Sequence, residues 1–199
     1  MKVGMIFECG PQGADRKVCE HLAKRIRPDL EIISETLDNK PNLIAECGIV
    51  AAQLLEDSCA RVLVVWDLYP AWRERGAKPC RKEDRDGIMA SLTSAGVGSD
   101  KVALVCIEEE LEAWLLADNR AISKVLSRPT HKVNIKRQRN PERGNPKKRM
   151  TKLFNENVGR PYHDLKHAEM IARAIPDLQR LRRVDAFRRF ALKVADVEL

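Results

Sequence analysis

The stretch from Arg61 to Trp66 is the feature that most limits how this chain can fold. It reads Arg-Val-Leu-Val-Val-Trp, a nearly continuous apolar run that ends at Asp67. Such runs are typical of strands buried on both faces, as the strands of a parallel sheet are. Three further segments have strand character, at residues 2–7, 30–37 and 102–107.

Helical periodicity fills the intervals between these strands. Apolar residues recur at helical spacing after Asp15, after Pro41 and between about residues 82 and 95. Asp15 is a candidate helix cap, and Asp38 or Asn39 before Pro41 is a helix-start signal. This alternation predicts an α/β fold, with a Rossmann-like, mostly parallel sheet of about four strands flanked by helices.

Length and spacing favour a single domain. A chain of 199 residues can bury one sizeable core and is too short for two full domains. We expect an α/β core over residues 1–122, a basic loop or insertion over 123–152, and helices over 153–199 that pack on the core as a C-terminal cap.

Composition points to a cytoplasmic protein without a membrane segment. The chain is 44% hydrophobic and 33% charged, and no apolar run approaches the roughly 18 residues that a membrane span needs. Its first eight residues have the character of a strand, not of a signal peptide. The six cysteines form no CxxC pair and no zinc-ligand spacing, which favours reduced thiols.

Acidic side chains follow three of the predicted strands. Glu8 follows the first, Asp67 the third, and Glu108 to Glu110 the fourth. The carboxyl ends of parallel strands form the crevice where ligands bind, so these acids converge if their strands are neighbours. Convergent carboxylates need compensation, and a few hard oxygen ligands suit Mg²⁺, which can activate water at a phosphodiester. The same acids could instead be loop starts, helix caps or first-turn partners of a helix dipole.

Two strings in the sequence resemble known families. Ile-Phe-Glu8-Cys-Gly10, then a capped helix and Val-Val-Trp-Asp67, resembles a toprim domain, in which a glutamate follows the first strand and an Asp-x-Asp follows the third. The string from Ile107 to Asp118, Ile-Glu-Glu-Glu-Leu-Glu-Ala-Trp-Leu-Leu-Ala-Asp, is similar to a motif of the toprim-related domain-of-unknown-function family 4276. The tail over residues 162–190 resembles that family too, so the resemblance covers most of the chain.

The resemblance implies a toprim-like core over residues 1–122 and phosphodiester chemistry that depends on Mg²⁺ or Mn²⁺. The sequence is also similar to overcoming-lysogenization-defect-type nucleases. Related families recur in prokaryotic anti-phage defence, beside partner ATPases. When the toprim roles are carried over residue by residue, the resemblance implies that Glu8, Asp67 and Glu110 are catalytic. The implied metal ligands are Glu8, Asp67, Glu108, Glu110 and Glu112.

Two departures from the toprim pattern bear on activity. Tyr69 stands where the second Asp of Asp-x-Asp is expected, and a tyrosine hydroxyl is a poor Mg²⁺ ligand at neutral pH. The toprim turn usually has an Asp four residues after its glutamate, whereas Asp15 lies seven after Glu8. The site could therefore be weakened, completed by the glutamates from 108 to 112, or inactive.

Positive charge is concentrated between residues 124 and 152. The chain carries a net charge of +7, and this segment holds eleven Lys or Arg residues against one Glu. Few aromatic residues interrupt it, which favours contacts to the phosphate backbone with little sequence readout, although a solvated loop is the alternative. The candidate nucleic-acid-binding residues are Lys136, Arg137, Arg139, Lys147, Lys148 and Arg149.

Other candidate sites have weaker patterns. His163 and His167 stand four apart and could share a helix face, but no glutamate completes an HExxH metal motif. The segment from Gly10 to Gly13 lacks a Walker Lys-Ser/Thr and is not GxGxxG. Trp114 is more typical of core packing than of a platform for substrate.

The leading hypothesis is a Mg²⁺-dependent nuclease acting on DNA or RNA in prokaryotic defence. The alternative is a non-catalytic toprim-like subunit that binds nucleic acid or a partner protein. A small-molecule phosphotransferase or nucleotide binder is a third reading, without a phosphate loop to support it. The sequence leaves the oligomeric state open, a homo-oligomer included.

Overall fold

The computed structural model of the chain describes residues 1–69, 78–108 and 110–195. Its centre is a four-stranded sheet in the order β2-β1-β3-β4, and every strand pair in the described chain is parallel. The strands are β1 (Lys2–Phe7), β2 (Glu31–Thr36), β3 (Arg61–Asp67) and β4 (Val102–Ile107). The predicted parallel α/β fold is confirmed, and three strands that end in acids are neighbours, as the convergence of those acids requires.

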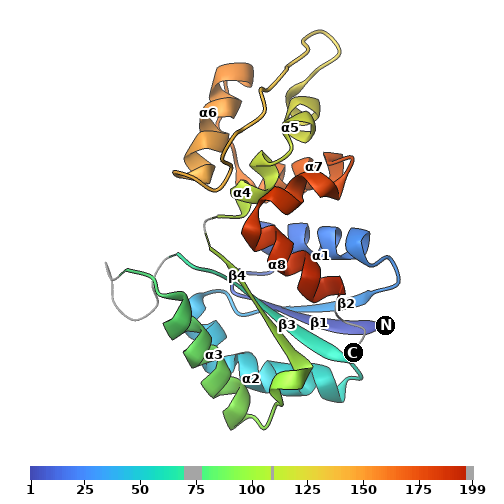
Figure 1. Ribbon diagram of the computed structural model, residues 1–199, viewed down its shortest axis with the longest axis vertical. Coiled ribbons are helices and arrows are strands. Elements are labelled where there is room, and N and C mark those ends of the chain that lie inside the picture. The colour runs from blue at the N-terminus through green and yellow to red at the C-terminus, as the bar shows by residue number, and fades with distance from the viewer. Residues whose placement is uncertain (70–77, 109, 196–199) are drawn as a thin grey trace.

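Helices cover both faces of this sheet (Figure 1). One face carries α1 (Ala14–Ile26) and α8 (Asp185–Ala195), and the other carries α2 (Lys40–Glu56) and α3 (Arg81–Ser94). The remaining helices stack beyond α1 and α8, and we call them the helical cap (Figure 1). They are α4 (Leu111–Leu116), α5 (Asn119–Leu126), α6 (Pro146–Val158) and α7 (Asp164–Ala174). Short 3₁₀ turns, η1 (Ser99–Lys101) and η2 (Leu178–Arg183), precede β4 and α8.

Alternate residues of the central strands enter two separate cores. In β3, Leu63 and Val65 join the core under α1, α8 and the helical cap, while Val62, Val64 and Trp66 join the core under α2 and α3. Both faces of the strand are therefore buried, which is why its sequence is apolar at nearly every position.

Side-chain caps explain where two helices begin. The Asn39 side chain accepts a hydrogen bond from the Asn42 backbone N–H at 2.9 Å, which confirms the start signal before Pro41. The Asn145 side chain does the same for Lys148 at 2.7 Å, so α6 begins at Pro146. The expectation of an irregular segment over 123–152 is therefore wrong at both ends, where α5 and α6 extend into it. Asp15 is not a cap either, because Gly13 is the N-cap of α1 and Asp15 lies in its first turn.

Trp114 is a core residue, as its sequence context indicated. Its side chain is fully buried, and its ring centroid lies 5.4 Å from that of Phe187 and 5.3 Å from that of Phe190. This aromatic contact joins α4 to α8 and so attaches the helical cap to the sheet domain. Across the described residues, no helix combines the length and the apolar character that a membrane crossing needs.

Candidate active site at the carboxyl edge of the sheet

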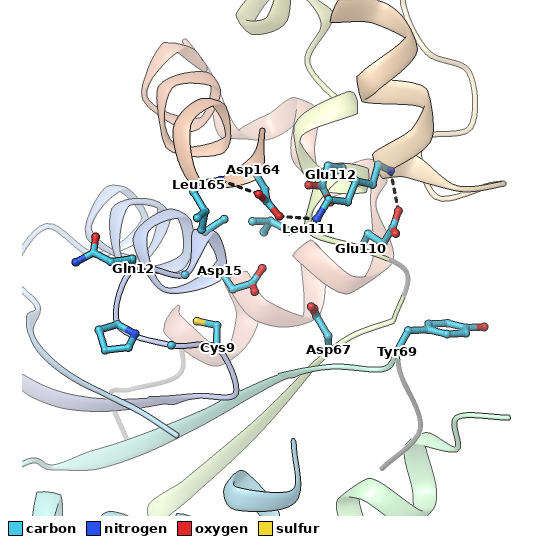
Figure 2. Close-up of a pocket in the computed structure, with 15 residues that line it drawn as sticks. Cys9, Gln12, Asp15, Asp67, Tyr69, Glu110, Leu111, Glu112, Asp164 and Leu165 are labelled. Atoms are coloured by element: carbon cyan, nitrogen blue, oxygen red, sulfur yellow. Dashed lines mark hydrogen bonds and ion pairs between the residues drawn. The ribbon is translucent and has the colours of Figure 1, made fainter. Parts of the chain in front are cut away.

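The connections of the sheet create a crevice between β1 and β3. The chain leaves β1 through α1 toward β2 on one side, and leaves β2 through α2 toward β3 on the other. The strand order thus reverses between β1 and β3, and in open α/β sheets this reversal is where ligands bind. A cavity of about 670 Å³ lies beyond the ends of these strands (Figure 2).

Five acids and one lysine are among the residues that line this cavity, which we call the acid cavity. The acids come from the start of α1, the end of β3, the start of α4 and the start of α7, and the lysine from the start of α6. They are Asp15, Asp67, Glu110, Glu112, Asp164 and Lys147.

Asp15 reaches the cavity because a tight turn starts α1 close to the end of β1. The Gly13 backbone N–H donates to the Gly10 carbonyl at 2.8 Å, and a Cβ at Gly13 would lie only 2.3 Å from Cys9 Sγ. Only a residue without a side chain fits this turn. Burial, and next the Asp164 carboxylate, raise the pKa of Asp15 to about 6, while Lys147 opposes the shift.

Asp67 ends β3 with its carboxyl facing other carboxyls. The pKa of Asp67 is well above its usual range. Burial is the largest cause, and the negative charges of Asp15, Glu8 and Glu112 add to it. Its Oδ1 is buried and has no hydrogen-bond partner in the described part of the chain. Figure 2 shows Asp15 and Asp67 extending toward the same space. A buried carboxylate oxygen that no protein group contacts can accept a hydrogen bond from water or bind a cation.

Glu8 contacts Asp67 but is not among the residues that line the cavity. Its Oε2 accepts a hydrogen bond from the Asp67 backbone N–H at 3.0 Å, so Glu8 holds the end of β3 in position. Burial raises the pKa of Glu8 to about 7, although Lys40 and this hydrogen bond act against the shift.

The start of α4 contributes two glutamates with different surroundings. The Oε2 of Glu110 accepts a hydrogen bond from the Lys147 backbone N–H at 2.7 Å. Glu112 is only 4% exposed, and burial raises its pKa to about 7. Tyr162 lies beside Glu112: burial and then the Glu112 charge raise its pKa, and its hydroxyl makes no hydrogen bond of ordinary geometry with a described residue.

Lys147 is the cation of the cavity and is bound to one of its acids. Its Nζ lies 2.5 Å from Asp164 Oδ2. Burial alone would lower the pKa of Lys147, but Asp164, Glu112 and Glu110 outweigh it and raise the value. Burial on its own would raise the pKa of Asp164, but the hydrogen bond from Lys147 outweighs burial, so the pKa of Asp164 is lowered. Asp15 and Asp67 are therefore left without a cation of their own.

The donor set fits a divalent cation bound largely through water. Within residues 1–69, 78–108 and 110–195, no three His, Cys, Asp or Glu side chains are arranged to hold a metal as they stand. Mg²⁺, however, usually takes one or two carboxylates and keeps several waters, so a complete protein cage is not required. Asp67, with its unpartnered oxygen, and Asp15 beside it provide such a pair.

The structure brings together only part of the predicted ligand set. Asp67, Glu110 and Glu112 line the cavity, and Glu8 accepts a hydrogen bond from the Asp67 backbone N–H. Glu108 lies elsewhere, since its Oε1 is 2.5 Å from Arg81 Nη1 and 2.9 Å from Arg189 Nη2. Glu109 lies outside the described residues. The predicted metal role of Glu108 therefore has no geometric support.

Sequence reasoning missed two acids of this cavity as site residues. Asp15 had a usable signal, because it is an acid in the first turn of a helix that follows a parallel strand. Asp164 had none, because only the folded helical cap brings the start of α7 to the sheet edge.

The predicted nucleic-acid-binding residues divide into two groups. The Arg149 guanidinium donates to the carbonyls of Asn140 and Arg143 at 2.7 and 2.8 Å and to the Gln138 side chain at 2.9 Å, so it folds the preceding segment. Lys147 belongs to the acid cavity. The exposed remainder is Lys136, Arg137, Arg139 and Lys148.

Comparisons with known proteins bear on the family alone. No curated protein and no solved structure matches the chain significantly. A family described as Domain of unknown function (DUF4276) matches residues 15–195, a span that begins at Asp15 and leaves Glu8 outside. Because this match covers most of the sequence, the chain belongs to the DUF4276 family.

Proposed function

We propose that this protein is a toprim-type nuclease that uses Mg²⁺ or Mn²⁺ to hydrolyse phosphodiester bonds of DNA or RNA. The observation that carries the proposal is the meeting of Asp15, Asp67 and Glu112, from three separate elements, in one cavity at the strand-order reversal. Asp67 supports it too, because its main charged neighbours are other acids and its buried Oδ1 has no partner among the described residues.

Each residue of the acid cavity has a role in this proposal. Asp67 and Asp15 would hold the metal ion, which when bound supplies Lewis acidity and a more acidic water. Glu112, whose pKa of about 7 suits proton transfer near neutral pH, accepts a proton from the attacking water. Lys147 balances the charge of a phosphate, and Glu8 positions Asp67.

The test is cleavage of labelled single- and double-stranded DNA and RNA with Mg²⁺, with Mn²⁺ and with EDTA. We expect metal-dependent cutting that falls by about 10²-fold or more in Asp67→Asn and Glu112→Gln. Glu108→Gln is the matched control, because Glu108 also follows β4 but is bound to Arg81 and Arg189 outside the cavity. Equal cutting by all three variants would refute the site.

A non-catalytic subunit that binds nucleic acid or a partner protein is the second candidate. It is favoured by Tyr69, which is 56% exposed and points away from Asp15 and Asp67 (Figure 2). In that case the wild-type protein would bind nucleic acid in a salt-sensitive way but cut nothing with either metal.

The cellular setting is also part of the proposal. All six cysteines are free, which supports a reducing cytoplasmic compartment. The resemblance to toprim-related defence proteins adds a partner ATPase. We expect ATP to change the cleavage rate only when that partner is present, which a reconstituted assay with and without ATP measures.

A further inference from the structure

A second cavity opens on the helical cap, on the other side of the start of α7. It has a volume of about 480 Å³ and lies among the ends of α5 and α6, the following turn and α7. We call it the cap groove. The lining residues that matter below are Arg128, Arg160, Lys166, Phe154, His167 and Met170.

The charge of the cap groove is opposite to that of the acid cavity. Arg128, Arg160 and Lys166 line it, and no described acid does. These three side chains are exposed and make no ion pair or hydrogen bond with a described residue. They contrast with Arg149, whose guanidinium is used inside the protein. Free cations around a concave surface suit an anionic ligand.

The floor of the groove is apolar and partly aromatic. The Phe154 ring lies 4.6 Å from the His167 ring, and Met170 is 52% exposed at the rim. His167 has its Nδ1 bonded to the His163 backbone N–H at 2.9 Å, which leaves that nitrogen unable to bind a metal. Flat rings and a flexible thioether favour a planar apolar group over a bare inorganic anion.

Tyr162 separates the groove from the acid cavity. Its hydroxyl end lies beside Glu112, while its ring packs 5.3 Å from Phe154 and 5.8 Å from His167. At the start of α7, Asp164 lines the acid cavity and the neighbouring His163 lines the groove. The two cavities are thus adjacent, and one extended strand can reach both.

We propose that the cap groove binds a nucleotide of single-stranded nucleic acid next to the phosphodiester held in the acid cavity. Arg128, Arg160 and Lys166 contact the phosphates on either side of it, and the base lies against His167 and Met170. A base inside a duplex is stacked and paired, so only an unpaired nucleotide enters. The proposal rests on the proposed function for the class of substrate, but the binding itself needs no metal.

The test measures binding of labelled single-stranded DNA and RNA in EDTA, across a range of salt. The groove variant is Arg160→Gln with Lys166→Gln. Its control is Lys24→Gln with Lys101→Gln, which removes the same charge from exposed positions that do not line the groove. Losing two phosphate contacts makes the slope of log affinity against log salt shallower by about 1.4. We expect this change, and about tenfold weaker binding, in the groove variant alone.

Three results would overturn the proposal: no binding by the wild-type protein, equal weakening of groove and control variants, or an unchanged slope. The base contact is tested by competition, in which a nucleoside monophosphate should displace the strand at lower concentration than inorganic phosphate. Equal competition would refute the base contact. Because no cleavage is measured, failure of the nuclease proposal and failure of this one are distinguishable.

Discussion

Asp84 and Asp67, two aspartates near the carboxyl edge of the sheet, have opposite surroundings. Asp84 is 1% exposed, and its Oδ2 lies 3.4 Å from Lys40 Nζ and accepts a hydrogen bond from Trp66 Nε1 at 3.2 Å. Asp67 has the carboxyls of Asp15, Glu8 and Glu112 as its main charged neighbours. Both side chains have a raised pKa because of burial, but Lys40 lies against Asp84 and acts only weakly on Asp67.

The difference separates structure from function within one sheet. A buried acid with a lysine and an indole N–H serves the packing between α2, α3 and β3. A group of buried acids without enough cations costs stability, and perturbed groups of this kind cluster at functional sites. The acid cavity is therefore the part of the molecule that a cationic ligand would stabilise, whereas Asp84 already has Lys40 as its counterion.

The largest effect is expected from breaking the Lys40–Asp84 ion pair. Lys40→Met leaves Asp84 buried beside an apolar side chain, which should lower the free energy of unfolding by about 3 to 5 kcal/mol. Urea denaturation measures it. Adding Asp84→Asn should restore most of the loss, and a change below about 1 kcal/mol in the single variant would contradict the role given to Lys40.

The acid cavity should respond in the opposite direction. The pKa of Glu112 is raised from 4.5 to about 7, so the folded state binds more protons than the unfolded state between these values. Unfolding free energy therefore falls as pH rises through this window. In EDTA, Glu112→Gln should match the wild type near pH 4 and exceed it by about 2 to 3 kcal/mol near pH 8.

Denaturation of both proteins at the two pH values checks this, and contributions from histidines cancel in the difference. Mg²⁺ should reduce the difference in unfolding free energy between the variant and the wild type at pH 8, because it stabilises the wild type more. If the difference in unfolding free energy is the same at both pH values, the pKa of Glu112 is not raised in the folded state.

A smaller effect distinguishes a structural arginine from its exposed neighbour. Arg149→Ala removes hydrogen bonds to the Asn140 and Arg143 carbonyls and should cost about 1 to 2 kcal/mol of stability. Lys148→Ala should stay within about 0.5 kcal/mol. Thermal denaturation compares them, and similar values would mean that the 138–143 segment does not depend on Arg149.

The smallest effect is expected at Glu108. Its ion pairs with Arg81 and Arg189 are partly exposed, so Glu108→Gln should cost less than about 1 kcal/mol. It should also leave the melting shift caused by Mn²⁺ unchanged, whereas Asp67→Asn should abolish that shift. A lost shift in Glu108→Gln would return Glu108 to the ligand set.

The fold was predictable because its signals are local. Apolar runs placed β1 and β4 at their observed bounds, and Asn39 with Pro41 marked the start of α2. For the site, Asp67 followed from its place at a strand end, and Glu110 and Glu112 followed from the family resemblance. Asp164 and the bound state of Glu108 depend on how distant helices pack, which no spacing in the sequence encodes.

One hydrogen bond connects the site to the order in which the chain is made. The Arg25 guanidinium donates to the Ile175 carbonyl at 2.6 Å, across 150 residues, and so fastens the end of α7 to α1. Synthesis supplies the four strands first, and the partners Lys147 and Asp164 follow about 40 to 60 residues after β4. A growing chain therefore has its strands before it has a complete acid cavity, and hydrolytic activity, on the proposed function, would begin only once α7 has been made and packed.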